Sequence, residues 1–194
     1  LSNSDFSLSG NSATTPGTYT LTYSATGNNT TGSKTKTWYI YARNISSGDL
    51  WIQYASGTAY CIVSIWPSIS LTVNGKTLTQ GTDFTRSQSG SYNAGDTATI
   101  TLTGKGNYQG TKSGTFKVVA RNIDNSSVNK CLTQESFQYT GSAITVNSYF
   151  YIYYYTYSDY HASTNDYSIA YSNNVNAGTA TMTITGKNNF TGTT

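Results

Sequence analysis

Apolar and polar residues alternate in short runs along this chain of 194 residues. In the clearest run, residues 97–103, threonines alternate with three apolar positions: Ala98, Ile100 and Leu102. Successive side chains of a β-strand point to opposite faces, so this run predicts a strand with one face on a core and a row of threonines on the other. A following run, residues 115–120, turns Phe116 and Val118 inward by the same rule.

Equivalent runs lie in two other parts of the chain. Residues 18–24 and 179–185 alternate in the same way, and their inward positions are Tyr19, Leu21 and Tyr23 in the first and Ala180, Met182 and Ile184 in the second. Residues 37–42, with Trp38 and Ile40 inward, match the run at 115–120. Turns rich in glycine and asparagine separate the runs, and no window has a convincing helical period, so the sequence predicts an all-β protein.

These runs belong to an internal repeat. The sequence Ala-Arg-Asn-Ile occurs at residues 42–45 and again at 120–123. An aspartate followed by an aromatic residue precedes each alternating run, at Asp5, Asp83 and Asp166, and a glycine-rich turn follows the run. We expect an acid that recurs once in each repeat to anchor a turn rather than to catalyse a reaction.

The repeat predicts tandem immunoglobulin-like β-sandwich modules with antiparallel strands and no substantial helix. We expect a partial module at residues 1–45 that lacks its opening strands, a complete module at 46–123, and a module at 124–194 that lacks its last strand. A sandwich without one strand exposes unpaired backbone groups and an apolar groove. Two explanations stay open: the chain is a segment of a longer repeat protein, or a neighbouring chain supplies a strand by β-augmentation.

Residues 166–174 and 176–192 are similar to tandem immunoglobulin-like repeats of bacterial surface proteins, the YDG/MBG-like modules of large adhesins. Residues 137–141 resemble the opening strand of that family. The resemblance covers nearly all of the second and third repeats and is weak in the first. It implies the type of module and no particular activity, because such repeats mostly act as spacers. The chain departs from the family pattern in its aromatic insertions and its few acids.

A tyrosine-rich insertion distinguishes the third repeat. As a strand it would place five phenol rings on one face: Tyr149, Tyr151, Tyr153, Tyr155 and Tyr157. Such a tyrosine ladder can stack on sugar rings, form a protein–protein interface, or pack across strands inside the module. All three interpretations stay open.

The second repeat carries an apolar insertion at residues 60–67, which is too apolar for a solvated loop and is expected to bury against a neighbour. It contains Trp66, a further candidate for a ligand site or an interface. Trp51, upstream, is expected to pack inside the protein. The two cysteines, Cys61 and Cys131, can form one disulfide or remain buried thiols.

Composition narrows the function classes. Charged residues make up 10% of the chain and the net charge is +3 without a basic cluster, so nucleic-acid binding is not expected. The apolar runs are far shorter than the roughly 20 residues of a membrane-spanning helix, so membrane insertion is not expected. Aromatic residues reach 14%, too many for a disordered chain. Low charge and abundant Ser, Thr and Asn favour an extracellular or cell-surface location.

The sequence contains little catalytic chemistry. Asp159 and His161 are close in sequence, but they lack the spacing of metal ligands and a second carboxylate. Residues 104–107 resemble a phosphate-binding loop only superficially, and we interpret them as a turn. We therefore expect no catalytic residue, no metal and no cofactor.

Two functions remain. The first is a non-catalytic structural or adhesive segment of an extracellular cell-surface protein, such as a stalk or a filament subunit, whose partners are neighbouring repeats or chains. The second is a binding module that holds a carbohydrate or a host surface glycoprotein on its tyrosine ladder. The two differ in one property, because rings that bind a ligand are exposed and structural rings are buried.

Overall fold

In the computed structural model every regular element is a β-strand, and the described part of the chain contains no helix. The structure describes residues 5–27, 31–53, 58–59, 65–124, 128–132, 135–146, 148–152, 160–161 and 163–194, with backbone alone at 58–59, 128–132, 148–152 and 160–161. The prediction of an all-β protein is confirmed. Across these ranges there is no helix long and apolar enough to cross a membrane.

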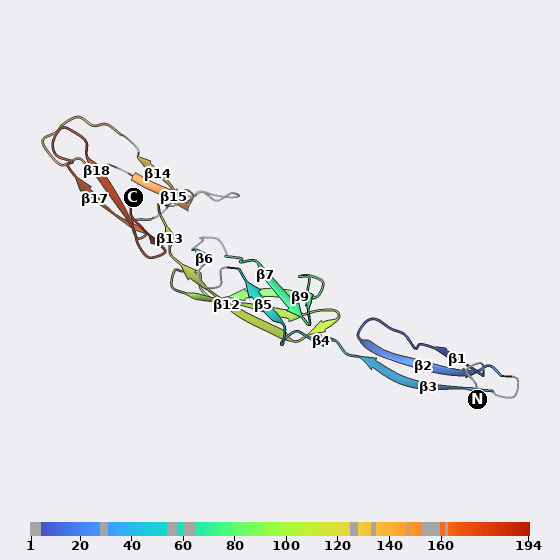
Figure 1. The fold of residues 1–194 in the computed structure, drawn as a ribbon. Coiled ribbons are helices and arrows are strands. Elements are labelled where there is room, and N and C mark those ends of the chain that lie inside the picture. Colours follow the sequence, from blue (N-terminus) through green and yellow to red (C-terminus); the bar gives the residue numbers. More distant parts are fainter. Residues whose placement is uncertain are drawn as a thin grey trace. The chain divides into compact units, whose positions relative to one another are not determined.

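The strands are numbered in chain order, and Figure 1 labels those for which there is room. They are β1 (Phe6–Ser9), β2 (Gly17–Ala25), β3 (Ser33–Ile40), β4 (Arg43–Asn44), β5 (Asp49–Ile52), β6 (Thr58–Ala59), β7 (Ile69–Val73), β8 (Lys76–Thr77), β9 (Phe84–Ser89), β10 (Thr97–Gly104), β11 (Tyr108–Gln109), β12 (Thr111–Val119), β13 (Arg121–Asn122), β14 (Val128–Leu132), β15 (Ser148–Ile152), β16 (Tyr160–His161), β17 (Tyr167–Ser172), β18 (Thr181–Gly186) and β19 (Phe190–Thr191).

Internal contacts divide the chain into two compact units. The first unit contains residues 1–51, 69–88 and 100–114, and the second contains residues 52–68, 89–99 and 115–194. The repeat predicted at 46–123 therefore contributes residues to both units.

The first repeat forms one antiparallel sheet with the strand order β1-β2-β3. The ladder between β2 and β3 places Tyr19 opposite Trp38, and the centroids of these two rings lie 4.9 Å apart. Nε1 of Trp38 donates a hydrogen bond to the carbonyl oxygen of Gly10. Tyr23, predicted to point into a core, is 43% exposed, and that prediction is wrong. The reason is that no second sheet covers β1-β2-β3 among the described residues.

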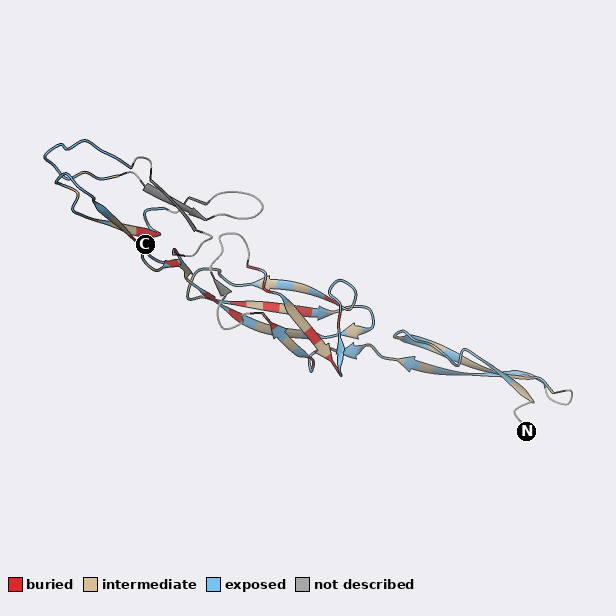
Figure 2. Cartoon of the chain, turned by 45° about the horizontal axis from the view of Figure 1, so that its top comes forward, coloured by how far each residue is buried: buried red, intermediate tan, exposed pale blue. Residues whose placement is uncertain are grey.

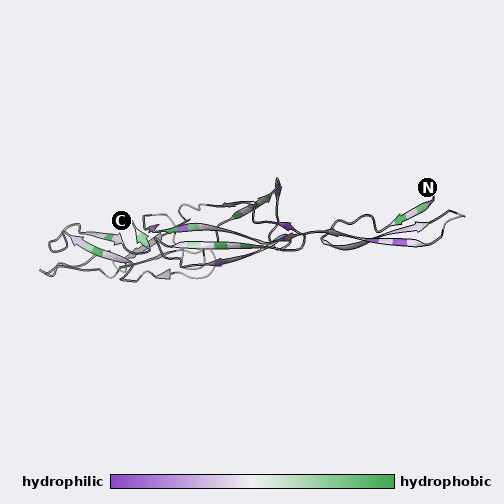
Figure 3. Cartoon of the chain, turned by 90° about the horizontal axis from the view of Figure 1, so that it is seen from below, coloured by the Kyte–Doolittle hydropathy of each residue, from purple (hydrophilic) through white to green (hydrophobic). Residues whose placement is uncertain are grey.

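The middle repeat contains two sheets, with the strand orders β6-β12-β10-β9 and β5-β7-β8. Its predicted inward positions are covered: Ala98, Ile100 and Leu102 are 0% exposed, and Phe116 and Val118 are 1% exposed. Figure 2 shows buried segments along these strands, and Figure 3 shows hydrophobic segments alternating with hydrophilic ones. The alternation predicted for β10 and β12 is therefore confirmed.

The third repeat contains a two-stranded sheet, β17-β18, and a three-stranded sheet, β14-β15-β16. β17 and β18 pair antiparallel, with Ile169 opposite Ile184. Ile184 is 3% exposed as predicted, whereas Met182 is half-buried and Ala180 is exposed. The inward prediction fails at Ala180, beside which no described strand takes the sheet position that β12 takes beside β10.

Among the described residues three short ladders are parallel, in contrast to the antiparallel pairing of β2 with β3 and of β17 with β18. They join β4 to β11, β6 to β12, and β13 to β19. Two sheets in the middle repeat are consistent with a β-sandwich, and the immunoglobulin-like strand order stays a prediction.

Candidate functional site

One turn recurs in all three repeats. In each repeat two backbone hydrogen bonds of 2.8–3.0 Å, each from an amide to a carbonyl oxygen, join equivalent residues. The bonds run from Thr26 to Asp5 and from Ala25 to Gly32 in the first repeat, from Lys105 to Asp83 and from Gly104 to Gly110 in the second, and from Lys187 to Asp166 and from Gly186 to Gly192 in the third. The structure thus aligns the repeats as the sequence does. The interpretation of residues 104–107 as a turn is confirmed.

The side chains of two of these aspartates also hold the short turns that come just before them. Oδ2 of Asp83 accepts a hydrogen bond from the Thr79 amide at 2.9 Å. Oδ2 of Asp166 accepts bonds from the amide and the hydroxyl of Ser163 at 2.8 and 2.9 Å. Asp166 is only 8% exposed, and a carboxylate that loses its water needs such donors. The predicted role of Asp83 and Asp166 as turn anchors is confirmed.

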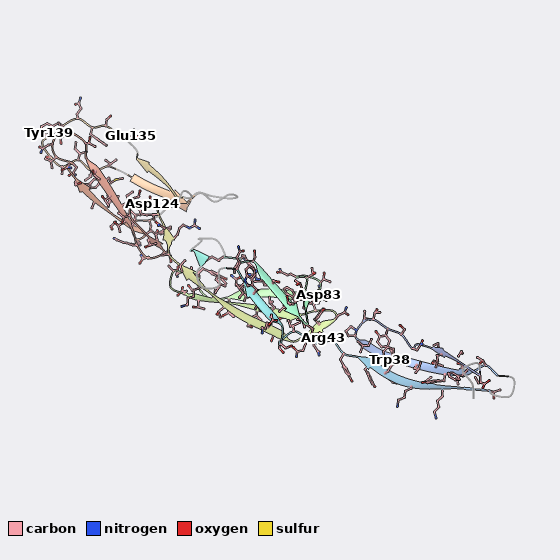
Figure 4. All side chains as sticks on the ribbon, viewed as in Figure 1. Trp38, Arg43, Asp83, Asp124, Glu135 and Tyr139 are labelled. Carbon is pink, nitrogen blue, oxygen red and sulfur yellow. The ribbon has the colours of Figure 1, made fainter. Side chains whose placement is uncertain are left out.

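The turn of the middle repeat also holds the linker that leads into that repeat. β4 of the linker pairs in parallel with β11 of the turn. The Arg43 amide donates to the carbonyl oxygen of Asn107 at 2.9 Å, and the Ile45 amide donates to that of Gln109 at 3.0 Å. We call this contact, between residues 42–46 and residues 104–112, the first joint. The exposed side chain of Arg43 marks its place in Figure 4.

The same contact forms between residues 120–124 and residues 186–192, and we call it the second joint. β13 pairs in parallel with β19. The Arg121 amide donates to the carbonyl oxygen of Asn189 at 2.9 Å, and the Ile123 amide donates to that of Thr191 at 2.8 Å. The first joint lies wholly in the first compact unit and the second joint wholly in the second unit.

An asparagine faces a glycine in each joint. Oδ1 of Asn44 and Oδ1 of Asn122 each accept a hydrogen bond from the backbone amide two residues further on, at 2.8 and 2.9 Å. A Cβ atom on Gly110 would collide with the side chain of Asn44, and a Cβ on Gly192 would collide with that of Asn122. The φ angles of the two glycines are 80° and 88°, which other residues rarely adopt. The turn therefore needs glycine for its backbone angle and for its closeness to asparagine.

A buried isoleucine completes each joint. Ile45 is 0% exposed and Ile123 is 1% exposed. The Gly48 amide donates to the carbonyl oxygen of Ile45 at 3.0 Å, and a Cβ on Gly48 would press on the side chains of Leu71 and Val73. Burying an isoleucine contributes about 1.5–3 kcal/mol, so each joint has an apolar anchor as well as backbone hydrogen bonds.

Each joint has further hydrogen bonds of its own. In the first joint Nε2 of Gln109 donates to the carbonyl oxygen of Ala42 at 2.8 Å. In the second joint Oδ1 of Asn189 accepts a bond from the Ala94 amide at 2.7 Å, and its Nδ2 donates to Oδ1 of Asn93 at 3.1 Å. The second joint therefore also ties the turn before β10 to the turn before β19.

Sequence reasoning identified both halves of the joints and missed that they touch. The signal was present, because the two segments recur together. Each Ala-Arg-Asn-Ile sequence is followed, later in the chain, by an alternating run and then by the glycine-rich turn. The contact itself depends on the fold, which brings the start of a repeat beside its last turn.

The predicted tyrosine ladder lies largely outside the described residues. Tyr153, Tyr155 and Tyr157 are outside them. Tyr149 and Tyr151 lie on β15, whose backbone pairs antiparallel with β14. The ladder and its three interpretations stay predictions.

The other candidates of the sequence have mixed outcomes. Trp66 is 55% exposed and lies between two buried neighbours, Ile65 and Pro67, so part of the apolar insertion is buried as expected. Cys61 is outside the described residues, and Cys131 is described by its backbone alone. The disulfide therefore stays a prediction.

Two exposed tyrosines escaped the sequence reasoning. Tyr39 and Tyr41 are 54% and 79% exposed, and their rings stack with centroids 6.0 Å apart and planes 17° apart. The signal was available, because turning Trp38 and Ile40 inward turns Tyr39 and Tyr41 outward together. Trp51 is 58% exposed, so the expectation that it packs inside the protein is wrong.

The described ranges hold no group of three acidic, cysteine or histidine side chains that could bind a metal ion. His161 is described by its backbone in β16, opposite Tyr151, and Asp159 is outside the described residues. The expectations of no catalytic residue, no metal and no cofactor stay predictions.

Comparison of the chain with protein-family models, with curated proteins and with solved structures finds no match in any of the three. The resemblance to bacterial immunoglobulin-like repeats therefore stays a prediction.

Proposed function

We propose that this chain is a non-catalytic structural segment of an extracellular, cell-surface protein, built from β-repeats in which a joint holds each linker to the repeat that follows it. The observation that carries the proposal is the recurrence of the joint, with the same parallel ladder, asparagine, glycine and buried isoleucine, at both places where one repeat leads into the next.

The chemistry of the joint fits a structural spacer. A flexible linker is rich in glycine and serine and keeps its backbone solvated. Here the linker backbone at Arg43 and Ile45 is hydrogen-bonded to the following repeat, and an isoleucine anchors it. In a repeat protein, stability depends on such contacts between neighbours. Low charge and the resemblance to bacterial surface repeats support the extracellular location.

Trypsin can test this proposal because each joint contains an arginine. We expect the native chain to resist cleavage after Arg43 and Arg121, since both peptide bonds lie in a ladder. Replacing both Asn44 and Asn122 by alanine weakens both joints. If the free energy of local opening falls by roughly 1.4 kcal/mol, cleavage at these arginines should become about tenfold faster. Mass spectrometry of the fragments identifies the sites.

The matched control is Asn11→Ala, an exposed asparagine outside both joints. It should leave the cleavage pattern unchanged. Rapid cleavage after Arg43 and Arg121 in the unaltered chain would show that the linkers are open, and the structural role would then lose its support.

A second candidate function is carbohydrate binding, and the stacked, exposed pair Tyr39–Tyr41 favours it. Flat exposed rings offer apolar faces to sugars while their hydroxyls form hydrogen bonds. Electrophoresis through gels that contain a polysaccharide tests this function. Retardation that disappears in the Tyr39→Ser/Tyr41→Ser variant, with thermal stability unchanged, would support it; equal mobility of both proteins in every gel would exclude this pair. Trp66→Ser tests the other exposed candidate in the same way.

A further inference from the structure

Positive charge is concentrated in the first compact unit. That unit contains seven of the eleven lysines and arginines of the chain and three of its eight acidic residues. The second unit contains the other four cations and five acids. The net charge of +3 is therefore the sum of a positive first unit and a slightly negative second one, and an anionic ligand would be attracted to the first unit.

The first joint gathers cations that are far apart in the sequence. Arg43 of β4 lies opposite Tyr108 of β11 in the parallel ladder, so their side chains leave the same face. Nζ of Lys76, from β8, lies 5.6 Å from the centroid of the Tyr108 ring, which is a cation–π contact. Tyr108 thus has one cation over its ring and a second cation beside it.

Two lysines of the same joint extend this cluster. Nζ of Lys112 donates to the carbonyl oxygen of Ser46 at 3.2 Å, and Nζ of Lys105 donates to that of Gly81 at 2.8 Å. An ammonium group has three donors, so one such bond leaves two for a ligand. These lysines and the two cations beside Tyr108 form what we call the cationic patch: Arg43, Lys76, Lys105 and Lys112.

The second joint forms the same ladder with fewer cations. Arg121 and Lys187 match two residues of the cationic patch, whereas the positions that match Lys76 and Lys112 hold no charged residue. The backbone geometry of a joint therefore does not require the second pair of cations. The joint alone does not explain why they are present in the first unit.

An exposed aromatic surface adjoins the cationic patch. The Tyr39–Tyr41 pair precedes it in the chain, and Tyr41, 79% exposed, is two residues before Arg43. Two residues of extended chain span at most about 7 Å, so the Cα atoms of Tyr41 and Arg43 are no further apart than that. A sugar ring on the tyrosines would therefore have a cation within reach of its substituents.

The face of the sheet that carries Tyr39 offers hydroxyl groups and no acid. Tyr39 lies opposite Thr18, and Thr20 lies opposite Thr37 in the ladder between β2 and β3. Side chains two apart on a strand share a face, and all three threonines are exposed. Their hydroxyls can donate and accept hydrogen bonds, as the hydroxyls of a sugar require, and they do not repel an anion.

We propose that the first unit binds an acidic polysaccharide, whose sugar rings stack on Tyr39 and Tyr41 and whose carboxylate or sulfate groups bind the cationic patch. Arginine forms paired hydrogen bonds with such groups, and lysine attracts them as a point charge. The proposed extracellular location favours a polysaccharide over a nucleic acid. The inference rests on the second candidate function, carbohydrate binding, and deepens it by naming the class of ligand.

Biolayer interferometry with the full chain and immobilised polysaccharides tests this inference. The probes are polygalacturonate and its uncharged methyl ester, and dextran sulfate and uncharged dextran. We expect at least one acidic polymer to bind at least about tenfold more tightly than its uncharged counterpart, and this polymer identifies the anionic group as carboxylate or sulfate. Its affinity should fall as salt is added, because salt screens exposed charges.

Arg43→Gln/Lys76→Gln removes two exposed cations and keeps the backbone hydrogen bonds of the joint. This variant should bind the acidic polymer at least about tenfold more weakly and the uncharged polymers as before. The matched control, Lys34→Gln/Lys36→Gln, removes the same charge from the same unit, on the face of β3 opposite to Tyr39. It should change the affinity by no more than about twofold, because its charges act only at a distance through salt.

A measurement on the unaltered chain keeps the inference testable where a variant fails to fold. Fragments of the acidic polymer should shift the amide signals of Tyr41, Arg43 and Tyr108 in nuclear magnetic resonance spectra. The signals of Arg121 and Phe190, the matching pair of the second joint, should stay in place. Shifts of equal size in both joints would show that the ligand does not select the first unit.

Equal affinity for acidic and uncharged polymers, equal losses in the two glutamine variants, or no binding of either acidic polymer would overturn the proposal. Polyglutamate or single-stranded DNA bound as tightly as the polysaccharide would also overturn it. A failure of carbohydrate binding itself is distinguishable. A chain that binds the uncharged polymers, and loses them in the Tyr39→Ser/Tyr41→Ser variant, retains that function whatever the cationic patch does.

Discussion

At the scale of single residues, the asparagine–glycine pairs explain why the joints have the sequence they have. Oδ1 of Asn44 accepts a hydrogen bond from the Ser46 amide of its own linker. The space beside the Asn44 side chain then admits only a residue without a Cβ. Gly110 fills that space with a φ angle of 80°. The same relation between Asn122 and Gly192 shows that the two residue types are coupled through space.

Gly110→Ala should therefore destabilise the chain more than Gly75→Ala. Gly75 has a similar φ angle, 77°, and open space around it, so both variants bear the backbone cost of about 1–2 kcal/mol. Gly110→Ala adds the collision with Asn44, about 1–3 kcal/mol for overpacking. Urea unfolding measures both variants. Adding Asn44→Ala to Gly110→Ala should recover part of the loss, and strict additivity would contradict a direct contact.

At the scale of elements, one strand pattern occurs in three environments. β10 lies between β12 and β9 in its sheet, and its apolar positions are fully buried. β2 lies between β1 and β3 without a second sheet over it, and Tyr23 is 43% exposed. β18 pairs with β17 along one edge, and its other edge is bonded to residues 192–194. The same alternation therefore yields a fully buried strand, a half-covered strand and a strand with an exposed end.

The aromatic residues of β12 and β3 should differ in their contribution to stability. Phe116 is 1% exposed, and truncating such a residue to alanine costs about 3–5 kcal/mol. Trp38 is half-buried, so Trp38→Ala should cost less although tryptophan is larger. Thermal unfolding followed by circular dichroism compares the stability of the two variants. Thr115→Ala, at an exposed position, is the control, and its free energy of unfolding should stay within about 0.5 kcal/mol of that of the unaltered chain. A larger loss for Trp38→Ala would mean that the first sheet has a cover in solution.

At the scale of the whole molecule, internal contacts divide the chain into two compact units, and each unit contains one joint. The first joint anchors Ile45 in one unit, and the second joint anchors Ile123 in the other. A chain organised in this way can lose one joint and keep the other, as expected of repeat proteins whose stability is a sum of local terms.

Ile45→Ala and Ile123→Ala should act on different parts of the chain. Each removes a fully buried side chain and should cost about 2–5 kcal/mol within its own unit. Hydrogen exchange by mass spectrometry should show faster exchange at 100–112 for the first variant and at 181–192 for the second. Faster exchange in both regions from either single variant would contradict independent units.

The candidate site was only partly predictable from the sequence. Asp83 and Asp166 were identified as turn anchors because a residue that recurs beside a turn has a local role, and local roles follow from local sequence. The contact of Arg43 with Asn107 was not predicted, because it joins a linker to a turn far along the chain. Tyr39 and Tyr41 could have been predicted from the alternation that placed Trp38 inward.

The sequence by itself determined where the strands lie and which side of each strand is apolar, because both follow from an alternation of period two that needs only neighbouring residues. Only the tertiary structure decided how deeply each apolar side is buried. Leu102, Tyr23 and Ala180 occupy predicted inward positions of the three equivalent alternating runs, yet the first is 0% exposed, the second 43% exposed, and the third exposed. The physical reason is that burial depends on what covers a strand, and the covering chain comes from elsewhere in the fold.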